Sequence, residues 1–195
     1  VLSNRLRELA FLNKGITIRM ADLRLPTKEK KHEFRFDGGV REFVHYLNKT
    51  KGPIHEPPVY IEGTKEGVGV EISMEYNEGY NESVFSFVNN INTREGGTHL
   101  VGFKSAITRT FNDFLKKSKQ SKKLEGSLSG EDVREGLTAV VSVKVPNPQF
   151  EGQTKAKLGN SEVKGIVESI VNEQLPLFLE ENPEIVDAIL DKTVT

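Results

Sequence analysis

The amino-acid sequence predicts an α+β fold in which a β-sheet packs against amphipathic helices. Strand-like segments occupy much of residues 16–90, and two long helical patterns follow. Between these helical patterns lies a run from Leu137 to Val145 that is almost continuously apolar and rich in β-branched residues. Such a run is typical of a strand buried on both faces, so we place it at the centre of the sheet. Strands followed by helices that cross back to a central strand define an α+β sandwich.

The N-terminal residues predict a helix and then two strands. Ser3 is a candidate N-cap for a helix that ends at Gly15, because hydroxyl side chains cap helix starts and glycine terminates helices. Alternating residues predict strands at 16–20 and 33–36. A basic turn is expected between them, at residues 25–31.

A short helix and three strands are expected next. The short helix is predicted by apolar residues at helical spacing, namely Val40, Phe43, Val44 and Leu47. After a proline-rich stretch, residues 59–63 and 67–76 are expected to form an antiparallel pair. Residues 77–80 then form a turn that leads to a strand at 83–90.

The middle of the chain predicts one long helix and one short helix. Thr98 is a good N-cap for the long helix. Its apolar stripe is formed by Leu100, Phe103, Ile107, Phe111, Phe114 and Leu115. Residues 116–126 are expected to form a polar linker. Ser129 and Asp132 have capping-box spacing, which predicts a short helix that ends at Gly136.

The C-terminal residues predict a long helix that is interrupted. Ser161 is expected to cap it, and its apolar side carries Val163, Ile166, Val167, Ile170 and Val171. Pro176 removes one helical hydrogen bond and crowds the carbonyl of Asn172, so we predict a kink or a break there. Residues 182–184, Asn-Pro-Glu, combine a cap, a first-position proline and a first-turn acid, which predicts a new helix.

Composition narrows the class of protein. The 195 residues fit one domain, and 36% of them are hydrophobic. The net charge of -1 gives no overall preference for nucleic acid. The chain has no cysteine, which excludes disulfides and cysteine nucleophiles and suits a reducing cytoplasm. No apolar run approaches the roughly 20 residues that span a membrane. Because the chain enters a helical pattern directly at Val1, we expect it to be part of a longer protein.

The loop between the predicted central strand and the last long helix carries the main functional signal. Its tip contains Gln153, Thr154 and Lys155, which offer an amide, a hydroxyl and an ammonium group. Lysine is a compact cation that binds phosphate as a point charge, and a glutamine amide adds hydrogen-bond donors. The tip is therefore suited to the terminal phosphate of a nucleotide. Taken alone, the tripeptide is weak evidence and favours an ordinary exposed polar loop, because Gln-x-Lys occurs by chance on many surfaces.

Four stretches resemble the gyrase B family of bacterial type II topoisomerases. They are the candidate first helix at residues 3–15, the strand and glycine turn at 87–99, the segment 129–137, and the loop 146–163. The resemblance covers essentially the whole chain in order. It implies one transducer domain over residues 1–195.

The resemblance also implies the layout and fold of this domain. Residues 1–15 correspond to a junction helix from an ATPase domain, 16–159 to the sheet, crossing helices and phosphate-sensing loop, and 160–195 to C-terminal helices. The implied fold is a two-layer sandwich of a mixed sheet with helices on one face. It is similar to the second domain of a small-subunit ribosomal protein, including a left-handed βαβ crossover.

The resemblance further implies a role in coupling ATP binding and hydrolysis to DNA strand passage and negative supercoiling. Gln153 and Lys155 would contact the γ-phosphate of ATP, with Thr154 a weaker candidate. ATP and Mg²⁺ would be bound mainly by the adjacent ATPase domain, so no self-contained catalysis is expected here. The implied partners are the gyrase A protein, double-stranded DNA and a second copy of the gyrase B protein. The implied location is the cytoplasm.

A basic face on the predicted helix from residue 100 to 116 is the second candidate site. Seven Lys or Arg residues stand against one aspartate between Lys104 and Lys123. This face is either ordinary solvated surface or a wall for DNA phosphates, which gives affinity without sequence preference. The resemblance favours the wall, because the family has a basic residue after Gly-Phe. The DNA-binding candidates are Lys104, Arg109, Lys116 and Lys117.

Two further alternatives stay open, and a metal site is not expected. The four histidines lack the close spacing of metal motifs, and a single residue such as His99 is more often structural. The alternative within the same class is the topoisomerase IV protein that corresponds to gyrase B. The alternative from another class is a free-standing nucleic-acid-binding α+β module.

Overall fold

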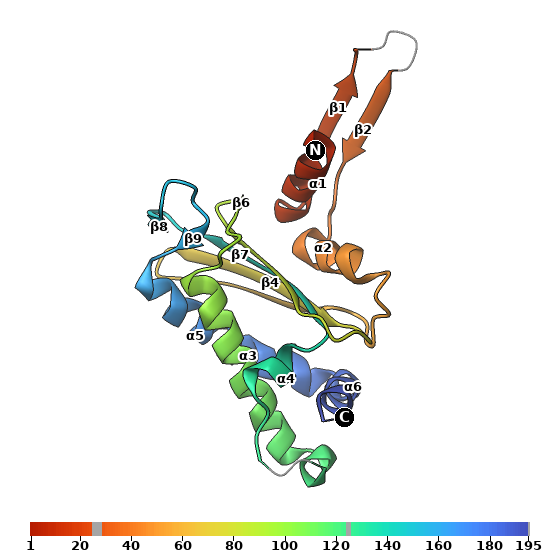
Figure 1. The fold of residues 1–195 in the computed structure, drawn as a ribbon, viewed down its shortest axis with the longest axis vertical. Coiled ribbons are helices and arrows are strands. Elements are labelled where there is room, and N and C mark those ends of the chain that lie inside the picture. The colour runs from red at the N-terminus through yellow and green to blue at the C-terminus, as the bar shows by residue number, and fades with distance from the viewer. Residues whose placement is uncertain (25–28, 124–125, 195) are drawn as a thin grey trace.

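A five-stranded mixed sheet forms the centre of the protein (Figure 1). The computed structural model describes residues 1–24, 29–123 and 126–194. The sheet has the strand order β3-β4-β7-β5-β6. Its strands are β3 (Val59–Lys65), β4 (Val68–Tyr76), β5 (Ser83–Val88), β6 (Ile91–Asn92) and β7 (Leu137–Lys144). β7 pairs antiparallel with β4 and parallel with β5, so the predicted central position of this apolar run is confirmed.

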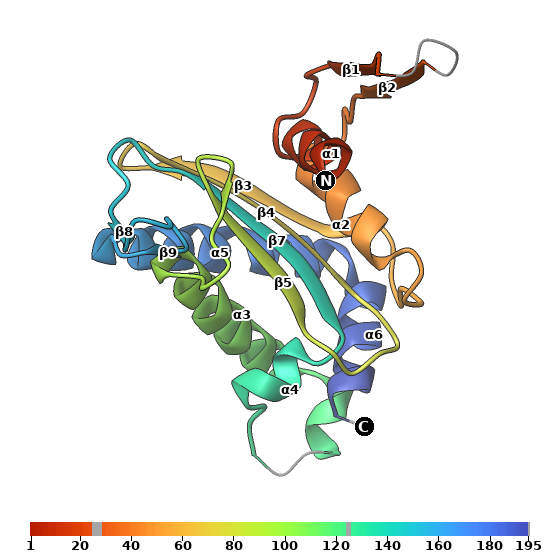
Figure 2. The ribbon, with the colours of Figure 1, turned by 45° about the horizontal axis from the view of Figure 1, so that its top comes forward.

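Two long helices cover one face of this sheet (Figure 2). They are α3 (Thr98–Lys117) and α5 (Ser161–Glu181), and their apolar stripes join the main hydrophobic core. The ring of Tyr76 on β4 meets Phe111 of α3 edge to face at 5.9 Å between centroids. Two more helices, α4 (Gly130–Arg134) and α6 (Pro183–Thr193), complete this layer. The predicted helix–sheet packing is therefore confirmed.

The opposite face of the sheet carries the helix α2 (Gly39–Asn48), which corrects the prediction that helices cover one face alone. Val40 and Val44 of α2 pack with Val140 of β7 in a second hydrophobic cluster. Phe11 of α1 (Leu2–Leu12) stacks in the same cluster, 4.7 Å from Phe43 between ring centroids. The physical reason is that β7 is buried on both faces: Thr138, Val140 and Ser142, on the face toward α2, are buried and therefore require a covering layer.

A separate β-hairpin extends from α1 and α2 away from the sheet (Figures 1 and 2). It consists of β1 (Ile18–Asp22) and β2 (Lys30–Phe34), which pair antiparallel. The two strands were expected, but they lie two to three residues away from the predicted ranges. Most of their side chains are exposed. Residues 25–28 of the predicted basic turn lie outside the described residues.

Three predicted N-caps are wrong, because Ser3, Thr98 and Ser161 lie inside α1, α3 and α5, whose caps are Val1, Gly97 and Asn160. The cap of α3 has a clear physical reason. Gly97 has φ 138°, and a Cβ there would lie 2.5 Å from the backbone nitrogen and oxygen of Leu158. Only glycine allows this close crossing of two chain segments. By contrast, the capping box of Ser129 and Asp132 is confirmed.

Pro176 does not break α5, which runs without interruption from Ser161 to Glu181. An interior proline costs about 3 kcal/mol. Here Val171, Leu175 and Leu179 continue the buried stripe across the proline. Burial of such side chains contributes about 1.5–3 kcal/mol each, which outweighs the lost hydrogen bond.

The predicted linker at residues 116–126 is partly helical. α3 continues to Lys117, and a short 3-10 helix, η1, follows at Lys119–Lys122. Residues 124–125 lie outside the described part of the chain. Among the described residues, none of the helices combines the length and hydrophobicity required to cross a membrane.

Candidate functional site

The candidate phosphate loop is a β-hairpin with an exposed tip. Its strands, β8 (Phe150–Glu151) and β9 (Lys157–Leu158), pair antiparallel. The predicted ligands Gln153, Thr154 and Lys155 all lie at the tip and are exposed to solvent. Lys155 adopts a left-handed conformation with φ 53°, which is uncommon for a residue with a side chain. The three side chains are therefore free to meet a ligand presented from outside.

The base of this hairpin is held firmly against the start of α3. The backbone nitrogen of Leu158 donates to Gly96 at 3.1 Å, and that of Glu95 donates to Ala156 at 3.0 Å. The Leu158 side chain is buried in the main core. These contacts connect the strand β9 directly to the glycine turn before α3.

Two asparagines fix the remaining ends of the loop, and sequence reasoning missed both. The side chain of Asn160 accepts from Gln149 N at 2.6 Å and donates to Asn147 O at 3.2 Å. The side chain of Asn89 forms both hydrogen bonds to the backbone of Val145, at 2.8 and 2.9 Å. Asn89 also has φ 48°. Asparagine tolerates this conformation and bonds nearby backbone, so the Asn89-Asn90 pair was the available signal.

The loop tip borders a hollow shared with the N-terminal helix. This hollow has a volume of about 580 Å³ and is lined by Val1, Asn4, Arg5, Glu8, Asn92, Arg94, Thr154 and Ala156. Arg5 donates to the carbonyl oxygen of Asn90 at 2.7 Å, which ties α1 to the turn beside β6. Of the three predicted ligands, Thr154 alone lines the hollow. The hairpin tip and the start of α1 therefore lie close enough to line one hollow together.

The first predicted DNA contact, Lys104, already has an anionic partner. Its ammonium lies 2.5 Å from Glu82 Oε1, while Arg134 Nε lies 3.0 Å from the other oxygen. Burial alone would raise the pKa of Glu82, but hydrogen bonds from Lys104 and Arg134 outweigh it and hold that pKa below its ordinary value. One carboxylate thus faces two cations, so the group formed by Lys104, Arg134 and Glu82 keeps a net positive charge.

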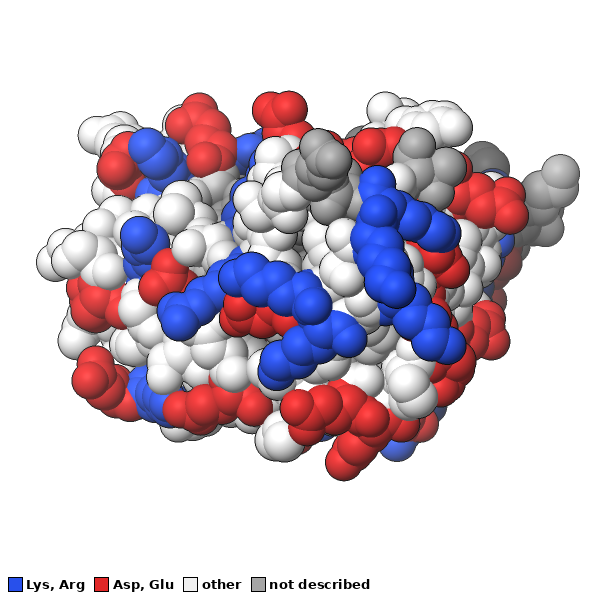
Figure 3. All heavy atoms as spheres, turned by 90° about the horizontal axis from the view of Figure 1, so that it is seen from below, with Lys and Arg blue, Asp and Glu red and all other residues white. Residues whose placement is uncertain are grey.

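The other predicted DNA contacts lie elsewhere on α3. Arg109 and Lys117 border a hollow of about 260 Å³ beside Pro176 of α5. Lys116 lies 3.6 Å from Asp113. Figure 3 shows Lys and Arg side chains at this end of the molecule interspersed with Asp and Glu. Lys104 thus contacts Glu82, Lys116 contacts Asp113, and Arg109 and Lys117 border α5.

Two polar residues near these sites have structural contacts. His99 is fully buried, and its Nε2 lies 3.0 Å from Thr93 Oγ1. Burial lowers the pKa of His99 to about 4, so the ring is neutral at pH 7. Asn112 exchanges hydrogen bonds of 2.8 and 3.0 Å with the backbone of Leu128. It thereby holds the segment before α4 against α3.

Solved structures with this fold define the class of protein. The fold matches about half of each ATPase-region structure of type II DNA topoisomerases. The 43K ATPase domain of Thermus thermophilus gyrase B, in complex with an aminocoumarin, matches with a TM-score of 0.89 and 40% identity, over 99% of this chain and 51% of that chain. The topoisomerase IV ATP-binding domain of Francisella tularensis matches with a TM-score of 0.81 and 28% identity. The match covers 99% of this chain and 51% of that chain.

The chain belongs to the DNA gyrase B family, which its residues 39–195 match. The DNA gyrase B protein of Treponema pallidum (strain Nichols) is 60% identical over 197 aligned positions, covering 100% of this chain. The chain spans 31% of the length of that relative, or about a third.

Proposed function

We propose that residues 1–195 form the transducer domain of a gyrase B-type protein. It couples ATP binding and hydrolysis in an adjacent ATPase domain to DNA strand passage and negative supercoiling. The observation that carries this proposal is the hairpin formed by β8 and β9, in which exposed Gln153 and Lys155 stand on a firmly held base. Such a hairpin can report the state of a ligand that another domain holds.

Lys155 supplies the positive charge for the γ-phosphate, and Gln153 donates to its oxygens. Thr154 shapes the turn and borders the hollow beside α1. Hydrogen bonds to a charged group contribute roughly 1.5–3 kcal/mol each, so losing two on hydrolysis removes roughly 3–6 kcal/mol. A bias of roughly 5.5 kcal/mol moves a two-state equilibrium from about 1:99 to 99:1. The loop can therefore act as a sensor of the nucleotide's third phosphate, because the two quantities are of similar size.

The same proposal assigns the parts of the chain. Residues 1–15 join the ATPase domain, 16–159 contain the sheet and the sensing loop, and 160–195 form the C-terminal helices. The β5-α3-β7 crossover is left-handed, as in the second domain of the small-subunit ribosomal protein. ATP and Mg²⁺ bind mainly in the ATPase domain, and the assembly acts in the cytoplasm with the gyrase A protein, DNA and a second copy of the gyrase B protein.

The basic residues of α3 contribute to the DNA cavity in this proposal. Arg109, Lys116 and Lys117 are exposed and can meet phosphates directly. Lys104 must exchange its contact with Glu82 for one with DNA. Replacing Lys104 with Gln is expected to weaken DNA transport and its salt dependence.

The phosphate-sensing role is tested by Lys155→Ala in the full-length protein. We expect ATP hydrolysis to fall roughly tenfold to a hundredfold, because a hydrogen bond to a charged group is lost. Lys157→Ala is the matched control, since Lys157 lies in the same hairpin but pairs with Glu151 at 3.0 Å. Steady-state ATPase rates compare the two variants. An unchanged rate in Lys155→Ala contradicts the proposal.

Two alternatives have their own discriminating measurements. A topoisomerase IV protein would give relaxation and decatenation without negative supercoiling when the full-length enzyme is reconstituted. A free-standing nucleic-acid-binding module would bind duplex DNA tightly as the isolated chain. The coupling domain proposed here binds DNA weakly by itself and hydrolyses no ATP.

A further inference from the structure

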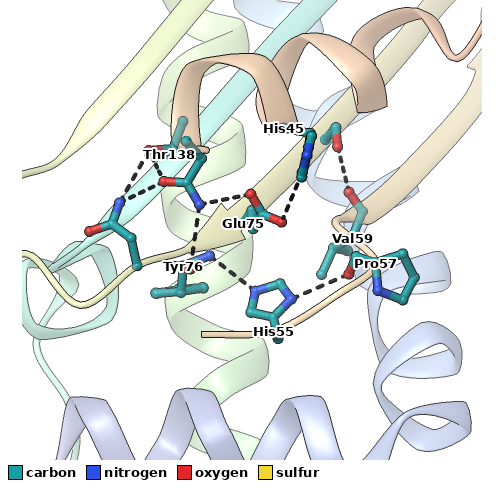
Figure 4. Close-up of polar contacts among 10 residues, drawn as sticks. His45, His55, Pro57, Val59, Glu75, Tyr76 and Thr138 are labelled. Atoms are coloured by element: carbon teal, nitrogen blue, oxygen red, sulfur yellow. Dashed lines mark hydrogen bonds and ion pairs between the residues drawn. The ribbon is translucent and has the colours of Figure 1, made fainter. Parts of the chain in front are cut away.

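Three potential metal ligands meet on the α2 side of the sheet, away from the phosphate loop. They are His45 on α2, Glu56 in the segment between α2 and β3, and Glu75 on β4. One ligand atom from each residue lies within 4.8 Å of the other two. Because the three residues come from different elements, no sequence spacing reveals them. Figure 4 shows His45 and Glu75 facing each other beneath α2.

Glu75 is the unusual member of this cluster. Its side chain is fully buried, and its Oε2 accepts from the Asn48 amide at 2.7 Å. Its Oε1 is buried without a hydrogen-bond partner among the described residues, and it lies 3.9 Å from His45 Nδ1. A buried polar atom without a partner costs roughly 1–3 kcal/mol, and more when it is charged. The orphaned oxygen is directed toward the other two ligands.

Apart from His45, the polar groups around Glu75 are already engaged. The Asn48 side-chain oxygen accepts from Asn77 at 2.8 Å and from Thr138 at 3.0 Å. The two ring nitrogens of His55 lie 3.0 Å from Tyr76 N and 3.3 Å from Pro57 O (Figure 4). This network fixes Glu75 in place and leaves Oε1 for a group that arrives from the solvent side.

We propose that His45, Glu56 and Glu75 bind a divalent transition-metal ion of the Zn²⁺ class. Imidazole nitrogen and carboxylate oxygen are both ligand types that Zn²⁺ binds, and three such ligands leave the fourth position for water. Two carboxylates also balance the charge of the ion. Mg²⁺ and Ca²⁺ are disfavoured because they select oxygen ligands alone.

The geometry requires a small closure of the cluster on the metal. Zinc bonds to nitrogen and oxygen are about 2.0–2.2 Å long, so two ligand atoms on one ion lie within about 4.4 Å of each other. His45 and Glu56 are exposed and can move, while buried Glu75 is fixed. The bound ion would connect α2 to β4 and to the segment before β3.

The test is a metal titration of the 195-residue chain without a histidine tag. Calorimetry with Zn²⁺ is expected to show one site, and Co²⁺ is expected to give the visible absorption of a low-coordinate ion. His45→Gln and Glu56→Gln should each weaken Zn²⁺ affinity tenfold or more. His32→Gln and Glu66→Gln, which replace exposed residues outside the cluster, should leave it unchanged. Zn²⁺ at 100 times its Kd should raise Tm by roughly 5–10 °C.

Three results overturn the proposal. The first is no Zn²⁺ binding to the unmodified chain, which means that the contact between His45 and Glu75 serves the fold alone. The second is binding that His45→Gln and Glu56→Gln leave intact, which places the ion elsewhere. The third is Mg²⁺ binding as tight as Zn²⁺ binding, which excludes the assigned metal class. Glu75→Gln is avoided as the main variant because Glu75 also holds Asn48.

Discussion

The molecule contains two small antiparallel hairpins that differ in how they are attached. The β1–β2 hairpin is mostly exposed, and outside its own strands it packs mainly against α1. The β8–β9 hairpin is tied at Gly96, Asn160 and Leu158 to the turn before α3 and to the cap of α5. The same secondary structure is therefore joined to the rest of the fold by few contacts in one place and by several hydrogen bonds in the other.

The strongest way to break this contrast is Gly97→Val. The new side chain would clash with the Leu158 backbone, since a Cβ at residue 97 lies 2.5 Å from its nitrogen and oxygen. We expect a loss of roughly 3 kcal/mol or more in the free energy of unfolding. Urea denaturation measures it. Gly152→Ala is the control, because it has positive φ but open space, and it should cost only about 1 kcal/mol.

His99 lies just after the glycine turn that holds the β8–β9 hairpin, and the pH dependence of stability tests this region. Its pKa is about 4 in the folded state and 6.5 in a model peptide, so the unfolded chain binds the proton more tightly. Stability is full above pH 6.5 and falls as the pH drops toward 4, by up to about 3 kcal/mol. Urea midpoints between pH 7 and 4 should show this loss. A His99→Gln variant that keeps the same slope would contradict it.

A smaller effect is expected for Asn160→Ala. The substitution leaves Gln149 N and Asn147 O without their side-chain partner, which costs roughly 1–3 kcal/mol. The β8–β9 hairpin should then open locally before the sheet unfolds. Amide hydrogen exchange is expected to accelerate at Gln149 and Gly159, with little change in β7. Uniform acceleration across the sheet would show that the hairpin does not open independently of the sheet.

The smallest effect is expected for Arg19→Ala in the β1–β2 hairpin. Arg19 pairs with Glu33 at 2.6 Å, but the Arg19 side chain is 80% exposed. Exposed ion pairs contribute about 0–1 kcal/mol, and salt reduces that contribution. The unfolding midpoint should therefore change little at about 0.15 M salt. A loss above about 1 kcal/mol in the free energy of unfolding would show that the β1–β2 hairpin stabilises the main fold.

The sequence predicted the parts of the fold that depend on local patterns. The run 137–145 and the stripes of α3 and α5 stood out because burial imposes a period on the chain. The failures share a different cause. Gly97 must cap α3 because of a residue 61 positions away, Leu158, and no local pattern contains that contact. Likewise, the helix on the second face of β7 follows from Val140, whose partners lie in α1 and α2.

For the candidate sites, too, the features set by local sequence were predictable, and those set by contacts between distant segments were not. The exposed tip at residues 153–155 lies where the loop pattern predicted it. The partner of Lys104 was not predictable, because Glu82 lies 22 residues earlier and outside the helix. The anchors Asn89 and Asn160 were missed for a similar reason, since each bonds backbone from another segment.

The pair of cations around Glu82 has a consequence for any anion that approaches α3. A phosphate that reaches Lys104 must displace a carboxylate, which then remains with Arg134 alone. This internal competitor sets a threshold. On the proposed function, a row of phosphates would meet this condition better than a single weak anion, because it carries many negative charges. Any anion that binds at this position would therefore compete with a carboxylate that the protein supplies itself.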